Sequence, residues 1–391
     1  MTLFPQAFSQ MLSDAYGPEI AACVLDALGN GTPSVSIRYN PSFPGPFAEA
    51  LTPIPWSPHG FLLAERPNFT LDPLFHAGCY YVQDSSAMFV GHLLRGLLDQ
   101  KAPGTRVLDL CAAPGGKTTD AAASLRERYG DGFTLLANEV MRPRFSVLRS
   151  NVRCWGDPRV GVVSRDPAVF GAEGPLFDIV IADVPCSGEG MFRKDPRALA
   201  EWSPETVAFC AARQRRILSD VWPALRPGGF LLYATCTFNP DENDRQLRWI
   251  CEELGAAIRD MGPAPEGILR TPEGGYALLP GLVPGEGQFA AVLQKSGEEK
   301  ALPGDPFRIF RAEVPAAAET ALAEAPEFEV DRRTALDFLH GDALRLPEAP
   351  LGLVTLTYRG RKLGQVKNIG SRCNNLYPKD RRIRMDIPIE L

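Results

Sequence analysis

Apolar runs and helical segments alternate through the middle of the chain. The apolar runs predict strands at Arg106–Leu110, Phe133–Asn138, Val160–Ser164, Phe177–Ala182 and Phe230–Ala234. Helical segments lie between them, at Lys117–Tyr129, Arg144–Cys154 and Pro204–Leu225, the last followed by Arg226-Pro-Gly-Gly229. Continuous apolar strands joined by helices are typical of a doubly wound parallel sheet. We therefore expect an α/β domain over residues 76–295.

The two flanks of this domain have different patterns. Residues 1–75 open with a helical stretch at about Phe8–Leu28 and continue through Pro- and Gly-rich sequence, which indicates irregular or short-stranded structure. Residues 296–330 are rich in Glu, Ala and Pro and predict a linker. Beyond them, Leu353–Tyr358 and Lys362–Lys367 alternate in polarity, so we expect a β-hairpin in a small domain over residues 331–391.

The composition narrows the class of protein. The chain has 391 residues, 45% hydrophobic and 23% charged, as in soluble globular proteins of two or three domains. No apolar run approaches the roughly 20 residues that cross a bilayer, and the first residues do not resemble a signal peptide. Nine cysteines lie scattered without CxxC pairs, which favours free thiols over disulfides or a metal site. We expect a cytoplasmic monomer without a metal.

Charge is distributed unevenly along the chain. The formal net charge is −6, yet residues 351–391 hold nine Lys or Arg against three Asp or Glu, a local balance of +6. The other 350 residues therefore carry −12. Such a basic segment is typical of a module that attaches to nucleic acid, and also of a solvated tail; charge alone does not separate the two.

The segment from Val107 to Thr119 predicts a cofactor site. A buried strand runs into a turn of small residues and then a helix, where backbone N–H groups can meet a ligand. A P-loop would need glycine at the position of Cys111, and the dinucleotide pattern GxGxxG is absent, so the turn favours the S-adenosylmethionine site of class I methyltransferases. Glu139, 23 residues beyond Gly116, is placed to bind ribose hydroxyls.

Two acidic positions keep a second interpretation. Asp166 ends the third predicted strand and could meet an adenine edge, although aspartate at a strand end is also a common turn residue. Glu139 could likewise be a solvated surface acid.

Two cysteines follow neighbouring predicted strands. Cys186 lies in Asp183-Val-Pro-Cys186 and Cys236 in Thr235-Cys236-Thr237. Ligands of open α/β sheets bind outside the carboxyl ends of strands, so both thiols are expected at the cofactor rim. A thiolate that adds to C6 of cytosine makes C5 nucleophilic towards a methyl sulfonium, and an acid such as Asp183 could hydrogen-bond to or protonate N3. Spacing alone does not say which cysteine is the nucleophile.

These motifs carry a resemblance. The run Cys111, Ala112, Ala113, Pro114, Gly115, Gly116 and Lys117, with Pro185-Cys-Ser-Gly188 and Thr235-Cys-Thr237, resembles the NOL1/NOP2/Sun family of RNA 5-methylcytosine methyltransferases. The motifs Gly78–Asp84 and Gly190–Asp195 look like its bacterial small-subunit subgroup, called F.

The resemblance implies roles for individual residues. Cys236 would be the nucleophile and Cys186 would assist product release. The cofactor contacts would be residues 111–117 with Glu139, Arg144, Asp166 and Asp183. The substrate would be RNA, foremost 16S rRNA or the small ribosomal subunit, held partly by a terminal domain similar to PUA RNA-binding domains.

Two other functions are compatible with this fold class. Methyltransferases of proteins or exocyclic nitrogens usually have an Asn- or Asp-Pro-Pro-Tyr-like loop after the fourth strand, where this chain has Asp183-Val-Pro-Cys186. A non-catalytic ribosome-assembly factor would be indicated by loss of a cysteine or of the glycine turn, and all of these are present.

Overall fold

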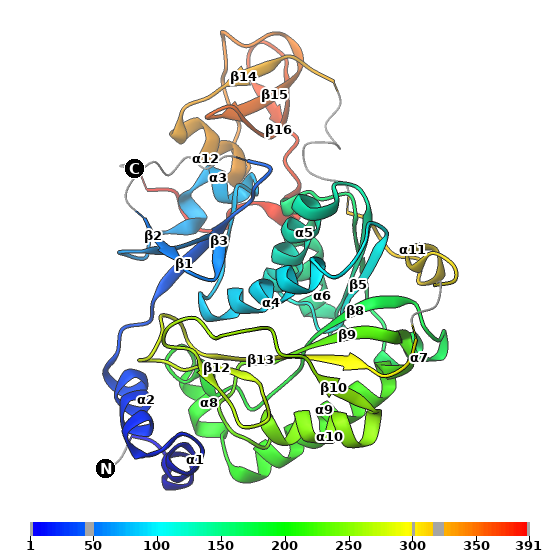
Figure 1. Ribbon diagram of the computed structural model, residues 1–391. Helices are drawn as coiled ribbons and strands as arrows, with labels where there is room; N and C mark the ends of the chain where they lie inside the picture. The colour runs from blue at the N-terminus through cyan, green and yellow to red at the C-terminus, as the bar shows by residue number, and fades with distance from the viewer. Residues whose placement is uncertain (1–2, 44–50, 299–301, 316–323, 389–391) are drawn as a thin grey trace.

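A large mixed sheet forms the centre of the computed structural model, which describes residues 3–43, 51–298, 302–315 and 324–388 (Figure 1). Its strand order is β11-β12-β13-β9-β8-β5-β6-β7, with β10 paired to β13. The parallel strands are β5 (Thr105–Asp109), β6 (Phe133–Asn138), β7 (Val160–Val163), β8 (Phe177–Asp183) and β9 (Leu225–Thr235). All five were predicted from the apolar runs.

The sheet is not parallel throughout. Strand β13 runs antiparallel to β9, and both β12 and β10 run antiparallel to β13. The bounds are β10 (Ala256–Ile258), β11 (Leu269–Arg270), β12 (Tyr276–Leu278) and β13 (Gln288–Lys295). The predicted helix at Pro204–Leu225 ends earlier, at Val221, because Pro223 has no N–H group with which to continue it.

Helices cover both faces of this sheet. One face carries α4 (Phe89–Leu98), α5 (Gly116–Tyr129) and α6 (Arg142–Trp155). The other carries α7 (Pro167–Ala172), α9 (Pro204–Val221) and α10 (Asp244–Leu254), with α8 (Pro196–Glu201) nearby. The predicted helical opening is two helices, α1 (Gln6–Tyr16) and α2 (Pro18–Asn30), split at Gly17 and packed on this second face.

A smaller sheet joins the N-terminal part to the central domain. Its order is β2-β3-β1-β4, with bounds β1 (Val35–Tyr39), β2 (Thr52–Ile54), β3 (Ser57–Leu63) and β4 (Tyr80–Val82). Short strands were expected here, and the sheet extends to Val82, which places it against α5 and α6.

The C-terminal domain contains the predicted hairpin. Strands β15 (Gly352–Tyr358) and β16 (Arg361–Asn368) pair antiparallel, flanked by β14 (Glu327–Glu329), β17 (Cys373–Asn375) and helix α12 (Arg332–His340). Part of the predicted linker, residues 299–301 and 316–323, lies outside the described residues. The part between them forms α11 (Pro306–Ile309), and Phe310 packs on Phe170 with ring centres 4.7 Å apart. This stretch is therefore attached to the central domain.

The N-terminal sheet and the C-terminal domain share one hydrophobic core. Ile37, Tyr80 and Leu74, the last on α3 (Pro73–His76), pack in the same cluster as Phe338 and Val354. Figure 1 shows α3 beside α12 at this junction.

Removing the Phe338 ring should weaken this junction. The side chain is fully buried, and its ring centre lies 5.2 Å from that of Tyr377. We expect Phe338→Ala to lower the free energy of unfolding by about 3–5 kcal/mol in urea titration, because a large cavity forms. Phe209 is 67% exposed, so Phe209→Ala should change the free energy of unfolding by less than about 0.5 kcal/mol. Equal losses in the two variants would contradict a shared core.

Candidate active site

The predicted cofactor turn lies between β5 and α5. Gly115 caps α5 with φ 112°, a left-handed conformation that favours glycine. Thr118 Oγ1 donates to Asp109 Oδ2 at 2.6 Å, which ties the first turn of the helix to the end of the strand. Burial raises the pKa of Asp109 to about 7, against the effect of this hydrogen bond. The start of α5 is thus tied to the end of β5, and the first N–H groups of a helix have no partner within the helix.

Glu139 and Arg144, two of the predicted cofactor contacts, lie beside this turn. Glu139 is 3% exposed, and its Oε1 accepts a hydrogen bond from the Met141 N–H at 2.8 Å. Its Oε2 lies 3.2 Å from Arg144 Nη1 and accepts no hydrogen bond from the residues that the structure describes. Arg144 Nη2 donates to the Ala113 carbonyl at 2.7 Å, so the arginine links the acid to the turn.

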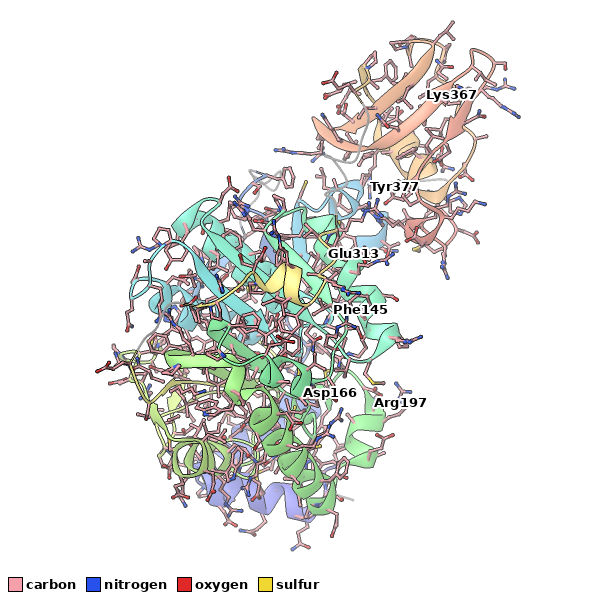
Figure 2. The ribbon with its side chains drawn as sticks, turned by 90° about the vertical axis from the view of Figure 1, so that its right-hand side faces the viewer. Phe145, Asp166, Arg197, Glu313, Lys367 and Tyr377 are labelled. Carbon is pink, nitrogen blue, oxygen red and sulfur yellow. The ribbon has the colours of Figure 1, made fainter. Side chains whose placement is uncertain are left out.

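Asp166 lies farther out. It is exposed and caps α7, with Oδ1 accepting a hydrogen bond from the Ala168 N–H at 3.1 Å. This is the turn role that the sequence left open. Figure 2 shows Asp166 on the face of the molecule that also carries Phe145 of α6.

The two predicted cysteines lie together at the carboxyl ends of β8 and β9. Cys186 Sγ and Cys236 Sγ are 3.3 Å apart, within hydrogen-bond distance for sulfur. Lys117, from the cofactor turn, donates to Asp183 Oδ2 at 2.8 Å. The structure therefore brings together the turn, an ion pair and two thiols in one place.

Two buried carboxylates connect the loops that carry Cys186 and Cys236. Glu242 accepts from the Ser187 N–H at 3.0 Å and from Gln214 Nε2 at 2.7 Å. Glu189 accepts from the Phe238 N–H at 2.5 Å and from Trp202 Nε1 at 2.9 Å. Both acids are fully buried, and each accepts hydrogen bonds from Asn239 Nδ2 at 2.8 Å. Sequence reasoning missed these residues, because an acid in a polar turn gives no sign that it is buried.

Neighbouring groups shift the pKa values of Cys186 and Lys117. The pKa of Cys186 is raised well above its usual value, first by its hydrogen bond with Cys236 and then by burial, with Glu242 and Asp183 adding to the effect. Burial lowers the pKa of the Lys117 amine, but the charges of Asp183 and of a Cys236 thiolate outweigh it, so that pKa is raised. The Cys186 thiol is therefore favoured in its protonated form, and the Lys117 amine in its charged form.

Cys111 lies at the start of the cofactor turn, between β5 and α5. Burial is the main cause that raises the pKa of the Cys111 thiol, and acidic neighbours add to that shift.

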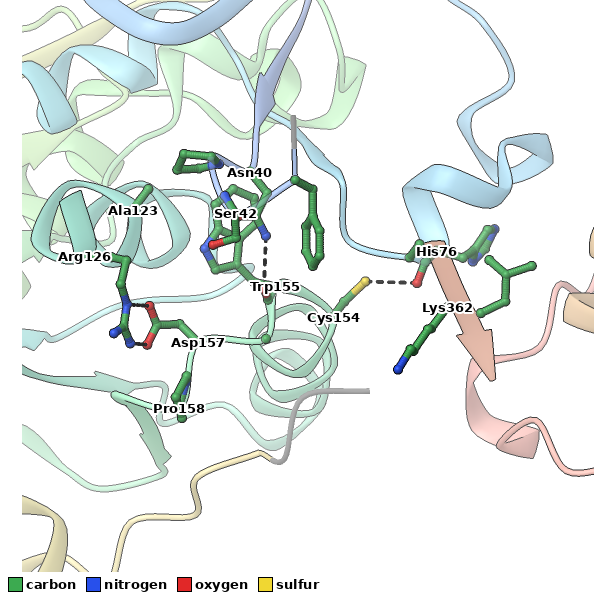
Figure 3. Close-up of a pocket in the computed structure, with 15 residues that line it drawn as sticks. Asn40, Ser42, His76, Ala123, Arg126, Cys154, Trp155, Asp157, Pro158 and Lys362 are labelled. Carbon is green, nitrogen blue, oxygen red and sulfur yellow. Dashed lines mark hydrogen bonds and ion pairs between the residues drawn. The ribbon is translucent and has the colours of Figure 1, made fainter. Parts of the chain in front are cut away.

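Within the described part of the chain, no group of three His, Cys, Asp or Glu side chains is placed to hold a metal ion, and no helix is long and apolar enough to span a membrane. A cavity of about 320 Å³ lies where the three domains meet, lined by residues that include Asn40, Cys154 and Lys362 (Figure 3).

Three known families match successive parts of the chain. "N-terminal domain of 16S rRNA methyltransferase RsmF" matches residues 4–85, "16S rRNA methyltransferase RsmB/F" matches residues 97–294, and "Methyltransferase RsmF PUA domain" matches residues 325–383. These matches confirm the predicted resemblance and the three-part α/β architecture.

Individual relatives agree with these matches. Ribosomal RNA small subunit methyltransferase F from Salmonella paratyphi C and from Escherichia coli O139:H28 are each 36% identical over 326 residues, which is 78% of this chain and 66% of theirs. The matched part therefore spans somewhat less than two thirds of these curated relatives. A crystal structure of a methyltransferase homolog protein from Pyrococcus horikoshii is 25% identical, with a TM-score of 0.63 over 75% of this chain and 96% of that chain. The chain belongs to the 16S rRNA methyltransferase RsmB/F family.

Proposed function

We propose that this protein transfers a methyl group from S-adenosylmethionine to C5 of a cytosine in 16S rRNA, through a covalent bond between Cys236 and C6 of the base. The observation that carries the proposal is the 3.3 Å pair of thiols next to the Lys117–Asp183 ion pair, at the end of the cofactor turn. The enzyme names of the 36% identical relatives support the reaction class and the small-subunit RNA substrate.

The residues around the turn fit S-adenosylmethionine. Glu139 Oε2 is buried and ion-paired with Arg144 Nη1 at 3.2 Å, but it accepts no hydrogen bond from the described residues, which leaves it able to accept one from a ribose hydroxyl. The free N–H groups at the start of α5 suit a carboxylate. When bound there, S-adenosylmethionine would supply the methyl group from its sulfonium.

Cys236 begins the chemistry in this proposal. Its thiolate forms a bond to C6, the C5–C6 electron pair attacks the methyl carbon, and the bond from that carbon to the sulfonium sulfur breaks. In this proposal the Lys117 ammonium, paired with Asp183, stabilises the negative charge that develops on the pyrimidine ring. We infer that Asp183, which lies 2.8 Å from Lys117, is the acid that hydrogen-bonds to the cytosine ring during this attack.

Cys186 assists release. After methylation, the C5 proton leaves to water, the C5–C6 double bond re-forms and the C6–Sγ bond of Cys236 breaks. The Cys186 thiol, which retains its proton, donates a hydrogen bond to the departing sulfur from 3.3 Å away. A charged leaving group that is stabilised in this way leaves faster.

Replacing Glu139 should weaken cofactor binding. We expect Glu139→Gln to raise the KM for S-adenosylmethionine by roughly 10- to 100-fold, because a hydrogen bond to a charged acceptor contributes about 1.5–3 kcal/mol. Steady-state kinetics with varied cofactor would measure this. Glu173→Gln, at an exposed acid after α7, is the matched control and should leave KM unchanged. A wild-type KM in Glu139→Gln would refute the assignment of the ribose contact.

The reaction product tests the proposal as a whole. Purified protein would be incubated with methyl-labelled S-adenosylmethionine and 16S rRNA, free or in small subunits, and the RNA digested to nucleosides. We expect the label in 5-methylcytidine. Label in an exocyclically methylated nucleoside or in protein would indicate one of the other methyltransferases, and no transfer would indicate an assembly factor. We further propose that the enzyme acts as a cytoplasmic monomer.

A further inference from the structure

Arg38 is a buried charge that crosses from the N-terminal sheet into the methyltransferase domain. It lies in β1 and is 1% exposed. Its guanidinium carbon lies 4.7 Å from the centre of the Trp155 ring. Figure 3 shows that tryptophan beside Asn40, whose amide donates to the Trp155 carbonyl at 3.1 Å. A buried guanidinium is costly unless it is well paired, so its partners indicate what it does.

Those partners belong to the cofactor turn. Arg38 Nη2 donates to the Gly116 carbonyl at 3.1 Å and to Thr119 Oγ1 at 2.6 Å, and Thr119 Oγ1 donates in turn to the Gly115 carbonyl at 2.9 Å. A peptide unit is planar and trans, so fixing a carbonyl also fixes the N–H on its opposite side. The N–H groups of Gly116 and Lys117, the first two of α5, are thereby oriented by Arg38 and Thr119.

Side chains from β4 and from the residue after it, Gln83, also contact Arg38 and the cofactor turn. Gln83 Oε1 accepts from Arg38 Nε at 2.8 Å, and Tyr81 Oη donates to the Pro114 carbonyl at 3.2 Å. A Cβ atom added at Gly116 would lie 3.4 Å from both of these side chains. The N-terminal sheet therefore packs closely against the cofactor turn.

We propose that Arg38 is a positioning residue for S-adenosylmethionine binding, and that the N-terminal sheet is through it a structural part of the cofactor site. The inference rests on the proposed use of S-adenosylmethionine by this turn. Arg38 does not touch the cofactor; it holds the backbone that does.

Calorimetric titration of the full chain with S-adenosylmethionine tests the proposal, together with KM values for cofactor and RNA. We expect Arg38→Met to weaken cofactor binding about tenfold, the effect of losing one well-placed hydrogen-bond network, with the KM for RNA within about twofold of wild type. Arg38→Lys keeps the charge but loses the several N–H donors of the guanidinium, so its cofactor affinity should lie between those of wild type and Arg38→Met.

Arg95→Met is the matched control. Arg95 Nη1 lies 3.3 Å from Asp120 Oδ1, the carboxylate oxygen that Arg38 Nε approaches at 3.8 Å, but its other hydrogen bonds go to Ser124 and Trp56. We expect Arg95→Met to be less stable than wild type and to bind the cofactor with unchanged affinity. If Arg38→Met does not fold, Thr119→Val removes the hydroxyl link to Gly115 and should weaken cofactor binding likewise.

The outcomes separate the two claims. Wild-type cofactor affinity in Arg38→Met, or in Thr119→Val where the first variant does not fold, would overturn the role of Arg38 and leave the proposed function intact. A wild-type protein that binds no S-adenosylmethionine would overturn the proposed function itself. An equal loss of affinity in Arg95→Met would show that the effect comes from the Asp120 ion pair and would also overturn the inference.

Discussion

Cys236→Ala is expected to lower methyl transfer by on the order of 10⁴-fold or more, as removal of a nucleophile does in other covalent enzymes. Without the thiolate, C5 of cytosine has no route to becoming nucleophilic. Cofactor binding should be unchanged, because Cys236 lies at the end of β9 and Glu139 after β6. Labelled methyl transfer to 16S rRNA measures the first effect, and calorimetry measures the second.

Cys251→Ala is a suitable control for this variant. It also removes one partly buried thiol, from α10, away from the cysteine pair. Its activity should stay near that of wild type. Full activity in Cys236→Ala, or an equal loss in Cys251→Ala, would show that Cys236 is not the nucleophile.

Cys186→Ala is expected to stop turnover at a later step. Cys236 can still attack C6, but its departing sulfur loses the thiol donor that lies 3.3 Å away. A protein–RNA adduct should therefore accumulate and survive denaturation. We expect multiple turnover to fall by roughly 10²- to 10⁴-fold, the range for loss of a positioned proton donor, while the first methyl transfer stays close to the wild-type rate.

A serine at the same position distinguishes hydrogen bonding from base catalysis. Cys186→Ser keeps an O–H donor, so the adduct should break down faster in Cys186→Ser than in Cys186→Ala. If Cys186 instead removed the C5 proton as a base, the serine variant would trap the adduct as fully as the alanine variant. Denaturing gels of single-turnover reactions, sampled over time, measure both rates.

The parallel strands could be predicted because each is buried on both faces. Strands such as β6 and β8 are therefore continuous apolar runs, readable without knowledge of their neighbours. The antiparallel strand β13 is also apolar, but its insertion beside β9 is a tertiary pairing that no local pattern encodes. The shared core of the N-terminal sheet and the C-terminal domain joins segments some 300 residues apart, which again lies beyond a local pattern.

Some residues of the candidate site could likewise be predicted from local sequence, and others could not. The two thiols, Lys117 and Glu139 could be placed because the carboxyl ends of parallel strands meet at one edge. The burial of Glu189 and Glu242 depends on N–H donors from the opposite loop, and the role of Arg38 depends on how a second sheet docks. These residues needed the folded chain.

The identity of the trapped adduct tests the central claim most directly. Cys186→Ala would be incubated with S-adenosylmethionine and 16S rRNA, the adduct digested with ribonuclease and protease, and the peptide sequenced by mass spectrometry. We predict a cytidine carrying one added methyl group, attached to Cys236. Attachment at another residue, or methylated RNA that forms without any adduct, would contradict the covalent mechanism.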